Sequence, residues 1–482
     1  MMDNLIFFNG IDRFFLAIPE IFLFCSILFL IPINLFFFKT KVFKSSSKYS
    51  YIVIIITLIL LLLLPSNGSA FNQLFFTDEY QKYIKSLILL TVFFILIISK
   101  NKSEIEGINF PEFNILILLS TCGMMMVVSS NNLITLYLSL ELQALPIYIL
   151  CALRKNDMRS AESSLKYFLL GALSSGFLLF GTSLIYGFTG YLNFEDILNN
   201  TIDTNIGLNF GLIFLISGIA FKISAAPFHM WAPDVYQGSP TPITLLISSA
   251  PKIASVSVLA ILTYNVFKNI HENWNDLIIV LCLSSMIVGS IGAVIQSNLK
   301  RLLAYSSISH MGFILLGLVS FSNAGLESIM FYLTIYLFLL VGVFSIILSL
   351  KKDNQTVEVL SDLKGLSNDY PFLSISLLIF MFSMAGIPPL SGFFSKWFVF
   401  YAAVESGYYT LAIVGVVFSV ISAFYYLKII KIMFFEISEN EVAIDQNFEL
   451  KTVLYICLVV TCLTFLFLPL LQNTILQSLL IF

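Results

Sequence analysis

Long runs without a charged residue are the feature that most limits the folds open to this chain. Residues 52–64 and 87–98 form two such runs, and about 20 apolar residues are enough for a helix to cross a bilayer. Backbone groups inside lipid must pair with one another, so only helices or a closed barrel can span it. The runs lack the alternation of polar and apolar residues that barrel strands need, so we expect helices.

The composition supports a membrane protein. The chain is 58% hydrophobic and 11% charged, whereas soluble domains average about 45–50% and about 25%. With charge so scarce, the net charge of −3 does not indicate a nucleic-acid partner. We therefore predict an all-α polytopic membrane protein.

Hydropathy and helix-breaking residues predict about 14 transmembrane helices. The predicted spans are 14–37, 51–64, 84–99, 111–128, 131–150, 161–188, 208–228, 241–266, 275–296, 300–320, 326–350, 371–403, 407–433 and 452–472.

The distribution of basic residues tests this count, because loops on the inner side of a membrane are enriched in Lys and Arg. Of the 25 Lys and Arg, 17 fall in loops that follow odd-numbered helices. They are Lys39, Lys41, Lys44, Lys48, Lys100, Lys102, Arg154, Lys155, Arg159, Lys300, Arg301, Lys351, Lys352, Lys364, Lys428, Lys431 and Lys451. Only Arg13, Lys82, Lys85 and Lys268 fall on the opposite side, which predicts that both termini face outward.

The four basic residues left over lie inside predicted helices: Lys166, Lys222, Lys252 and Lys396. Glu141 in helix 5 and His310 in helix 10 add two more titratable groups at membrane depth. A charge at the middle of a membrane helix costs about 2.5–3.5 kcal/mol on insertion scales, and such residues usually face the bundle interior and serve a function. Ion pairing that only fixes helix packing is the alternative, most plainly for Lys166, which follows Glu162 by one turn.

Two of the predicted helices contain breaks beside these lysines. Pro227 follows Lys222 in helix 7, and Gly386, Pro388 and Pro389 precede Lys396 in helix 12. Proline removes a helical hydrogen bond and clashes with the preceding turn. Unwound backbone at membrane depth is tolerated only inside protein or beside water, so each break predicts a site for an ion.

The two breaks are five helices apart, and an odd offset inverts the orientation of a helix in the membrane. We therefore expect two inverted five-helix repeats, helices 4–8 and 9–13, each with a discontinuous fourth member. The expected division is 1–109 for an N-terminal three-helix segment, 110–268 and 269–433 for the repeats, and 434–482 for an acidic loop with helix 14.

The chain carries no motif for a redox centre or a nucleotide. The six cysteines form no CxxC pair, the histidines at 229, 271 and 310 are scattered, and GxGxxG, P-loop and HExxH motifs are missing from the sequence. We expect no metal or cofactor in this chain.

The buried groups suggest a proton path. A lysine exchanges protons near neutral pH only if burial counteracts its high reference pKa, and a neighbouring carboxylate opposes that effect. Glu141 moving toward or away from Lys222 would then switch the lysine between holding and releasing a proton. In this hypothesis the proton passes through Lys252, with His310 as a relay, and leaves by Lys396.

Five stretches carry a family resemblance: LYLSLELQALPIYIL, AESSLKYFLLGALSSGFLLFG, FKISAAPFHMWAPDVYQGSPTPITLLISSAPKIAS, QSNLKRLLAYSSISHMGFILLG and FSMAGIPPLSGFFSKW. In this order, over about residues 110–430, they resemble subunit 2, the N-type subunit, of proton-pumping NADH:ubiquinone oxidoreductase (respiratory complex I), which is similar to Mrp-type antiporters. The resemblance implies 14 helices, two inverted repeats and proton translocation. It implies roles for Glu141, Lys166, Lys222, Lys252 and Lys396. It places NADH, FMN, iron–sulfur clusters and ubiquinone in partner subunits, among them neighbouring antiporter-like subunits.

Other functions fit parts of the pattern. An Mrp-type sodium/proton antiporter subunit would use the same lysines and breaks, a plastid NAD(P)H dehydrogenase subunit is a close variant, and a purely structural membrane subunit would not need so many buried lysines. Frequent Phe and Ile favour an organellar genome, which predicts the mitochondrial inner membrane with both termini in the intermembrane space. A bacterial inner membrane is the alternative.

Overall fold

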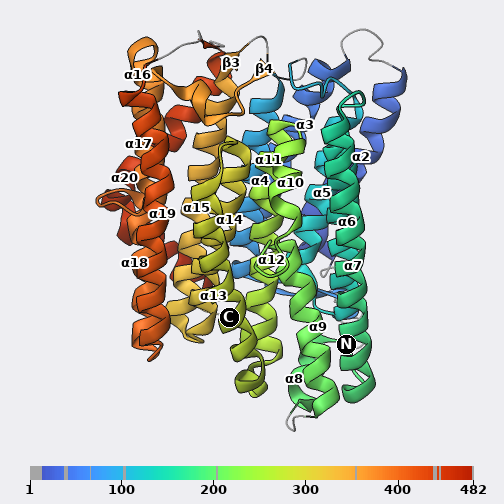
Figure 1. Ribbon diagram of the computed structural model, residues 1–482. Coiled ribbons are helices and arrows are strands. Elements are labelled where there is room, and N and C mark those ends of the chain that lie inside the picture. The colour runs from blue at the N-terminus through green and yellow to red at the C-terminus, as the bar shows by residue number, and fades with distance from the viewer. Residues whose placement is uncertain are drawn as a thin grey trace.

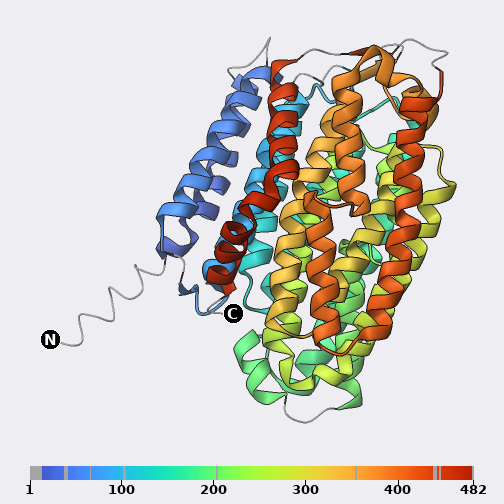
Figure 2. The ribbon, with the colours of Figure 1, turned by 90° about the vertical axis from the view of Figure 1, so that its left-hand side faces the viewer.

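The computed structural model describes residues 14–36, 42–65, 67–100, 102, 105–201, 205–352, 355–437, 442–444 and 447–479. These residues form a bundle of helices whose axes are roughly aligned with one another (Figure 1). The first helices and the last helix stand together at one side of the bundle (Figure 2), where α20 packs on α4 and α15. The predicted ends of the chain, and Lys39 and Lys41 of the charge count, lie outside the described residues.

The helices of the first half are the short 3-10 turn η1 (Phe15–Ala17), α2 (Ile18–Phe36), α3 (Val42–Leu63), α4 (Glu79–Lys100), α5 (Glu112–Ser129), α6 (Leu133–Cys151), α7 (Met158–Thr189), α8 (Phe194–Asn200), α9 (Ile206–Lys222), α10 (Trp231–Gly238), α11 (Thr241–Ser248) and α12 (Ala250–Ile261).

The second half begins with the π-helical turn η2 (Leu262–Val266) and the 3-10 turn η3 (Lys268–Ile270). It continues with α13 (His271–Ile295), α14 (Leu299–Val319), α15 (Asn323–Ser349), the 3-10 turn η4 (Leu360–Leu363), α16 (Leu366–Asp369), α17 (Pro371–Ala385), α18 (Ser391–Glu405), α19 (Tyr409–Phe435) and α20 (Phe448–Leu479).

Short antiparallel strands lie at the ends of the bundle. β1 (Gly68–Ala70) pairs with β2 (Phe75–Thr77), and β3 (Leu350–Lys352) pairs with both β4 (Gln355–Thr356) and β5 (Ala443–Ile444). Hydropathy did not predict these strands, because each is only two or three residues long.

Among the described residues, 12 helical spans are long and apolar enough to cross a membrane, and α9 and α17 are shorter apolar helices. The prediction of an all-helical polytopic membrane protein is therefore confirmed. The shorter helices are the first parts of the two spans predicted to be broken. In the predicted helix 7 (208–228), α9 ends at Lys222, and α10 begins three residues beyond the predicted end, at Trp231. The predicted helix 12 (371–403) is divided into α17 and α18.

The predicted span 241–266 is confirmed as long and apolar enough to cross a membrane, but it is not one regular α-helix. This span is interrupted at Ser249, whose φ of −119° and ψ of −88° are not helical, and it ends in the π-helical turn η2. Pro251 is the physical reason, since it has no amide hydrogen to continue the helix and restricts the residue before it. The span therefore consists of α11 and α12.

One backbone motif occurs twice, with a constant offset of 166 residues. Leu133 N donates to the carbonyl oxygen of Leu192 (3.0 Å), and Leu299 N donates to that of Glu358 (2.7 Å). Asn132 and Asn298, which cap α6 and α14 with their side chains, form isolated bridges to Asn193 and Val359.

A pair of close helix crossings repeats the same offset. A Cβ at Gly123 would lie 2.4 Å from the backbone nitrogen of Gln143, and a Cβ at Gly289 would lie 2.4 Å from that of Ser309. Both glycines thus allow two backbones to approach closely, α5 on α6 and α13 on α14.

Two lysines that the charge count assigned to loops lie inside helices. Lys85 is in the second turn of α4 and Lys300 is at the start of α14, and both side chains are fully buried. Lys85 pairs with Glu20 of α2 at 2.6 Å, which ties the N-terminal helices to the bundle. The count located the correct helix ends but could not show that these side chains turn inward.

Gly392 provides a test of the packing at the second break. A Cβ there would lie 1.9 Å from the carbonyl oxygen of Ser383 in α17. We expect Gly392→Ala to destabilise the protein by about 1–3 kcal/mol or more, because overpacking forces the backbone to move. Gly176→Ala is the control, since a Cβ at that helical position meets no atom within 4 Å. Thermal unfolding in detergent, followed by intrinsic fluorescence, would contradict the expectation if both variants melted alike.

Candidate functional site

Lys222 is a buried cation at the end of a half-helix. It is the last residue of α9, its side chain is 3% exposed, and its Nζ has no hydrogen-bond partner among the described residues. The carboxylate of Glu141 on α6 lies 3.7 Å away and also accepts a hydrogen bond from Ser175 of α7. The negative end of the α9 dipole and Glu141 together stabilise the charged lysine.

Lys252 lies at the N-terminal end of a half-helix, whereas Lys222 lies at a C-terminal end. Lys252 is the third residue of α12, directly after the break at Ser249, and its side chain is fully buried. The positive end of a helix dipole disfavours a cation. Its Nζ donates to hydroxyls instead of carboxylates, namely Ser224 Oγ at 2.5 Å and Ser307 Oγ.

Ser224 connects the two lysines. It lies two residues after Lys222 in the unwound segment of helix 7 and has a left-handed φ of 57°. This conformation is uncommon for a residue with a side chain and is found most often at functional sites. The break that ends α9 after Lys222 therefore also supplies an acceptor for Lys252.

His310 is on α14, one turn after Ser307. Its imidazole ring lies between the hydroxyl groups of two tyrosines from α15 and α19. Its Nδ1 is 2.6 Å from the hydroxyl of Tyr332, and its Nε2 is 2.9 Å from that of Tyr426. Tyr426 also bonds to Ser306 at 2.5 Å. The side chains form a continuous line of hydrogen-bonding groups that begins next to the Lys252 contact at Ser307.

Lys396 uses the second break in the manner the sequence predicted. Its Nζ donates to the carbonyl oxygen of Ala385, the last residue of α17, and to Ser419 Oγ, each at 2.9 Å. This carbonyl is free because the helix ends there. Lys396 and His310 line one small cavity of about 10 Å³ with Tyr332 and Tyr336, close to the smallest space that holds a water molecule.

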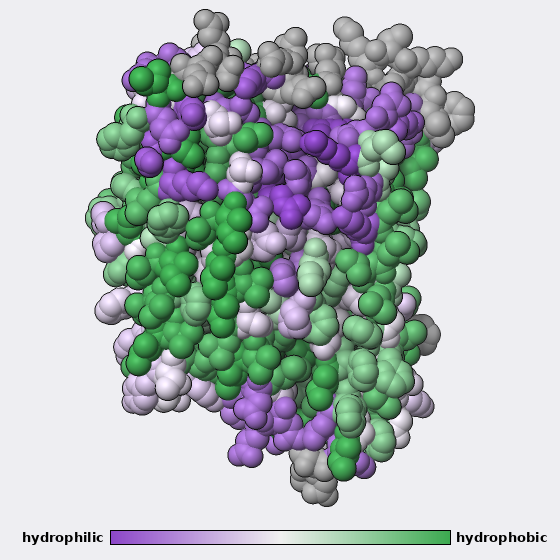
Figure 3. All heavy atoms as spheres, in the orientation of Figure 1, coloured by the Kyte–Doolittle hydropathy of each residue, from purple (hydrophilic) through white to green (hydrophobic). Residues whose placement is uncertain are grey.

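Lys166 does not belong to this buried line. Its side chain is 41% exposed and pairs with Glu162 and Asp234, each at 2.7 Å. Asp234 of α10 also binds Arg301 of α14 at 2.6 Å. Lys166, Glu162, Asp234 and Arg301 line one pocket. Figure 3 shows a broad hydrophilic area on the upper part of one face of the molecule. The contacts of Lys166 favour the packing interpretation.

Several residues of the site were missed. Tyr332, Tyr426 and the serines contact the predicted groups, and Asp234 partners Lys166. A tyrosine pair such as Tyr425–Tyr426 in an apolar helix was an available signal, because a buried tyrosine hydroxyl usually finds a partner. The partners themselves depend on helices far apart in the chain.

The groups at the two breaks are of kinds that can exchange protons. Basic nitrogen atoms, hydroxyls and an imidazole alternate from Lys222 to Lys396, and each of these groups can donate and, when neutral, accept a hydrogen bond. These features define the class: an antiporter-like membrane protein with ionisable groups at discontinuous helices.

Comparison with known proteins agrees with this class. Residues 130–422 match the family model described as NADH:quinone oxidoreductase/Mrp antiporter, transmembrane. A chain of respiratory complex I from Thermus thermophilus has the same fold, with a TM-score of 0.80 and 28% identity over 94% of this chain and 98% of that one. The Mrp complex from Dietzia has a chain with a TM-score of 0.80 at 19% identity, covering 96% of each, a likeness of fold alone.

The relatives narrow the class to one family. NADH-quinone oxidoreductase subunit N of Pelagibacter ubique is 44% identical over 466 residues, 97% of each chain. That of Rhizobium meliloti is 45% identical over 379 residues, 78% of this chain and 79% of the relative. The chain belongs to the family of NADH-quinone oxidoreductase subunit N, the antiporter-like, proton-translocating membrane-arm subunit of complex I. These relatives are bacterial, so they lend no support to the predicted mitochondrial location.

Proposed function

We propose that protons cross this subunit along Glu141, Lys222, Lys252, His310 and Lys396. The observation that carries the proposal is that three buried lysines lie at or near the ends of half-helices, and that one of them, Lys252, donates to two serine hydroxyls. A purely structural subunit would not need three lysines and a histidine buried in the membrane, because each of these groups is costly to bury.

The first step of the path is a change of charge at Glu141 and Lys222. Their 3.7 Å separation is longer than a normal hydrogen bond, so a small movement of α6 relative to α9 would strengthen or break the pair. Breaking it leaves Lys222 without a countercharge, which favours release of its proton toward Ser224 and Lys252.

The middle of the path uses hydroxyls. Lys252 hands its proton to Ser307 of α14. Ser306, the preceding residue of α14, bonds to Tyr426 of α19, which bonds to His310. From His310 the cavity shared with Lys396 leads to the second break. Lys166 was predicted to take part in proton translocation. Its exposed ion pairs with Glu162 and Asp234 support a packing role instead, at α7, α10 and α14, and we propose that role for it.

The path spans two proposed inverted repeats, residues 110–268 and 269–433, between the N-terminal segment 1–109 and the tail 434–482. The duplicated motif at 131–133 and 297–299 supports this division, as does the similar placement of the broken helices. With each broken helix counted once, the 12 spans and two shorter apolar helices of the described residues support the proposed 14 crossings.

The proposed setting is the membrane arm of NADH:quinone oxidoreductase, with NADH, FMN, iron–sulfur clusters and quinone held by partner subunits and other antiporter-like subunits alongside. Bacterial relatives favour a cell inner membrane with the basic face toward the cytoplasm; in a mitochondrion the same face would meet the matrix. The rival, a sodium/proton antiporter subunit, would show pumping that depends on sodium.

Lys396→Met tests the proposal in the assembled complex, reconstituted into vesicles. We expect fewer protons pumped per electron, because methionine keeps the bulk but removes the nitrogen that donates to Ala385 and Ser419. Lys431→Met, at an exposed position of α19, is the control. An unchanged ratio of protons to electrons in Lys396→Met would contradict the proposal.

A further inference from the structure

A three-residue link joins the two broken helices of the first half. Ser239, Pro240 and Thr241 run from the end of α10 to the start of α11, and all three are buried. One end continues the helix that is interrupted after Lys222. The other end leads, through α11, to the break at Ser249 and to Lys252.

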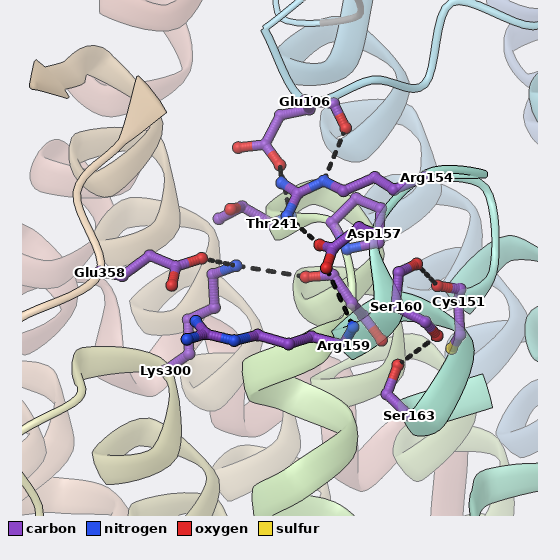
Figure 4. Close-up of polar contacts among 12 residues, drawn as sticks. Glu106, Cys151, Arg154, Asp157, Arg159, Ser160, Ser163, Thr241, Lys300 and Glu358 are labelled. Carbon is purple, nitrogen blue, oxygen red and sulfur yellow. Dashed lines mark hydrogen bonds and ion pairs between the residues drawn. The ribbon is translucent and has the colours of Figure 1, made fainter. Parts of the chain in front are cut away.

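Two buried charges of opposite sign hold this link. Lys300 Nζ donates to the carbonyl oxygen of Ser239 at 3.2 Å, and Thr241 N donates to the carboxylate of Glu106 at 2.9 Å. Both charged side chains are fully buried. The close-up in Figure 4 shows Glu106 and Lys300 on opposite sides of the link.

Each of these charges is itself anchored. Glu106 pairs with Arg154, whose Nε also donates to the backbone oxygen of Glu106 at 2.9 Å. Lys300 pairs with Glu358 at 3.1 Å (Figure 4). We call Glu106, Arg154, Lys300 and Glu358 the linker clamp. Its members come from four separate segments, so the clamp fixes the positions of these segments relative to the link.

The clamp bears on the proton path through α14. Lys300 lies two turns before Ser307 on that helix, and Ser307 accepts the hydrogen bond of Lys252. Thr241 starts the segment that carries Lys252. The contacts of Glu106 and Lys300 therefore fix the position of α11 and α12 along the axis of α14. That position determines whether the Lys252 side chain reaches Ser307.

Glu106 is suited to a fixed charge and not to carrying protons. Burial alone would raise its pKa, but Lys300, Arg154 and the Thr241 amide outweigh burial and hold the pKa below its ordinary value. The carboxylate therefore stays ionised at physiological pH, and its hydrogen bond to the link stays in place.

We propose that Glu106 and Lys300 are positioning residues that hold the Ser239–Thr241 link so that Lys252 stays within reach of Ser224 and Ser307. This inference rests on the proposed proton path and adds to it the groups that maintain its geometry. Neither residue contacts Lys252, so their effect is transmitted through the link and through α14.

Two substitutions remove the contact in different ways. Glu106→Ala removes the acceptor together with a charge, whereas Thr241→Pro removes the amide donor and the threonine hydroxyl but no charge, at the first helical position, where proline is tolerated. Asp157→Asn is the matched control. It neutralises a carboxylate that lies 3.8 Å from Arg154 but does not touch the link, and asparagine can still cap α7.

In the assembled complex, we expect Glu106→Ala and Thr241→Pro to slow NADH-driven proton pumping about tenfold or more and to displace its pH optimum, since small misplacements near reacting groups have large effects. Hydrogen–deuterium exchange over residues 236–246 should be faster in both variants. Asp157→Asn should match the unsubstituted complex in rate, pH profile and exchange.

The outcomes separate the two proposals. Faster exchange with an unchanged pumping rate and pH optimum overturns the positioning role. If Glu106→Ala fails to assemble, Thr241→Pro decides, because it leaves every charge in place. Normal pumping by Lys252→Met would overturn the proton path itself, whereas impaired pumping by Lys252→Met with normal pumping by Thr241→Pro overturns only the positioning role.

Discussion

Replacing Lys222 with methionine is expected to lower proton pumping by the assembled complex at least about tenfold, which corresponds to about 1.4 kcal/mol in an activation barrier. Lys222 is the only basic group within 4 Å of the Glu141 carboxylate among the described residues. Without it, no nitrogen connects Glu141 to Ser224 and Lys252. Pumping by inverted membrane vesicles, driven by NADH, measures the effect.

Glu141→Gln distinguishes a charge switch from a simple packing contact. On its own it leaves Lys222 buried without a countercharge, and breaking such a pair costs about 3–5 kcal/mol in fully buried cases. We expect the double variant with Lys222→Met to assemble better than Glu141→Gln alone but to pump no better than Lys222→Met. Lys268→Met, at an exposed position, serves as the control. If the double variant recovered pumping, the pair would have only a packing role.

His310→Phe is expected to reduce proton pumping by a similar factor, at least about tenfold. Phenylalanine fills the same buried space but cannot bond to Tyr332 or Tyr426, so the line of hydrogen-bonding groups would end at Tyr426. Tyr426 keeps its bond to Ser306, but a Tyr332 hydroxyl left without a partner would cost about 1–3 kcal/mol, so the amount of assembled complex has to be measured beside pumping.

Tyr426→Phe is a sharper version of this experiment, because it removes a single oxygen atom that joins Ser306 to His310. Tyr167→Phe is its control, at a buried tyrosine that stacks on Trp231 with ring centroids 4.4 Å apart. We expect Tyr426→Phe to impair pumping and Tyr167→Phe to leave it intact. Equal pumping by both variants, with His310→Phe impaired, would mean that His310 receives its proton by another route.

Much of the architecture could be predicted because its causes are local. The cost of a charge in lipid singled out Lys222, Lys252 and Lys396, and all three side chains are buried. Proline chemistry predicted the breaks at Pro227 and at Pro388–Pro389. The same reasoning could have predicted the break before Pro251, but a single proline near a serine pair was too weak a signal beside the long apolar run.

The partners of the buried groups could not be predicted, because they come from distant segments. Glu141 and Lys222 are 81 positions apart in the numbering, and Glu106 and Thr241 are 135 apart. The apolar period of a helix shows which face is buried, but it does not show which neighbour that face meets. The charge count failed for Lys85 and Lys300 for the same reason, since each turns toward a carboxylate on another segment.

The amino-acid sequence by itself determined the class of fold, the crossings, the broken helices and the identity of the buried lysines, because solvation and backbone hydrogen bonding act on each segment separately. Only the tertiary structure decided which of these groups meet. Lys166 pairs with carboxylates at the surface, Lys252 donates to hydroxyls, and Glu106 accepts a hydrogen bond from the amide of Thr241. Those choices depend on the register between helices, which packing sets across the whole bundle and which no single segment contains.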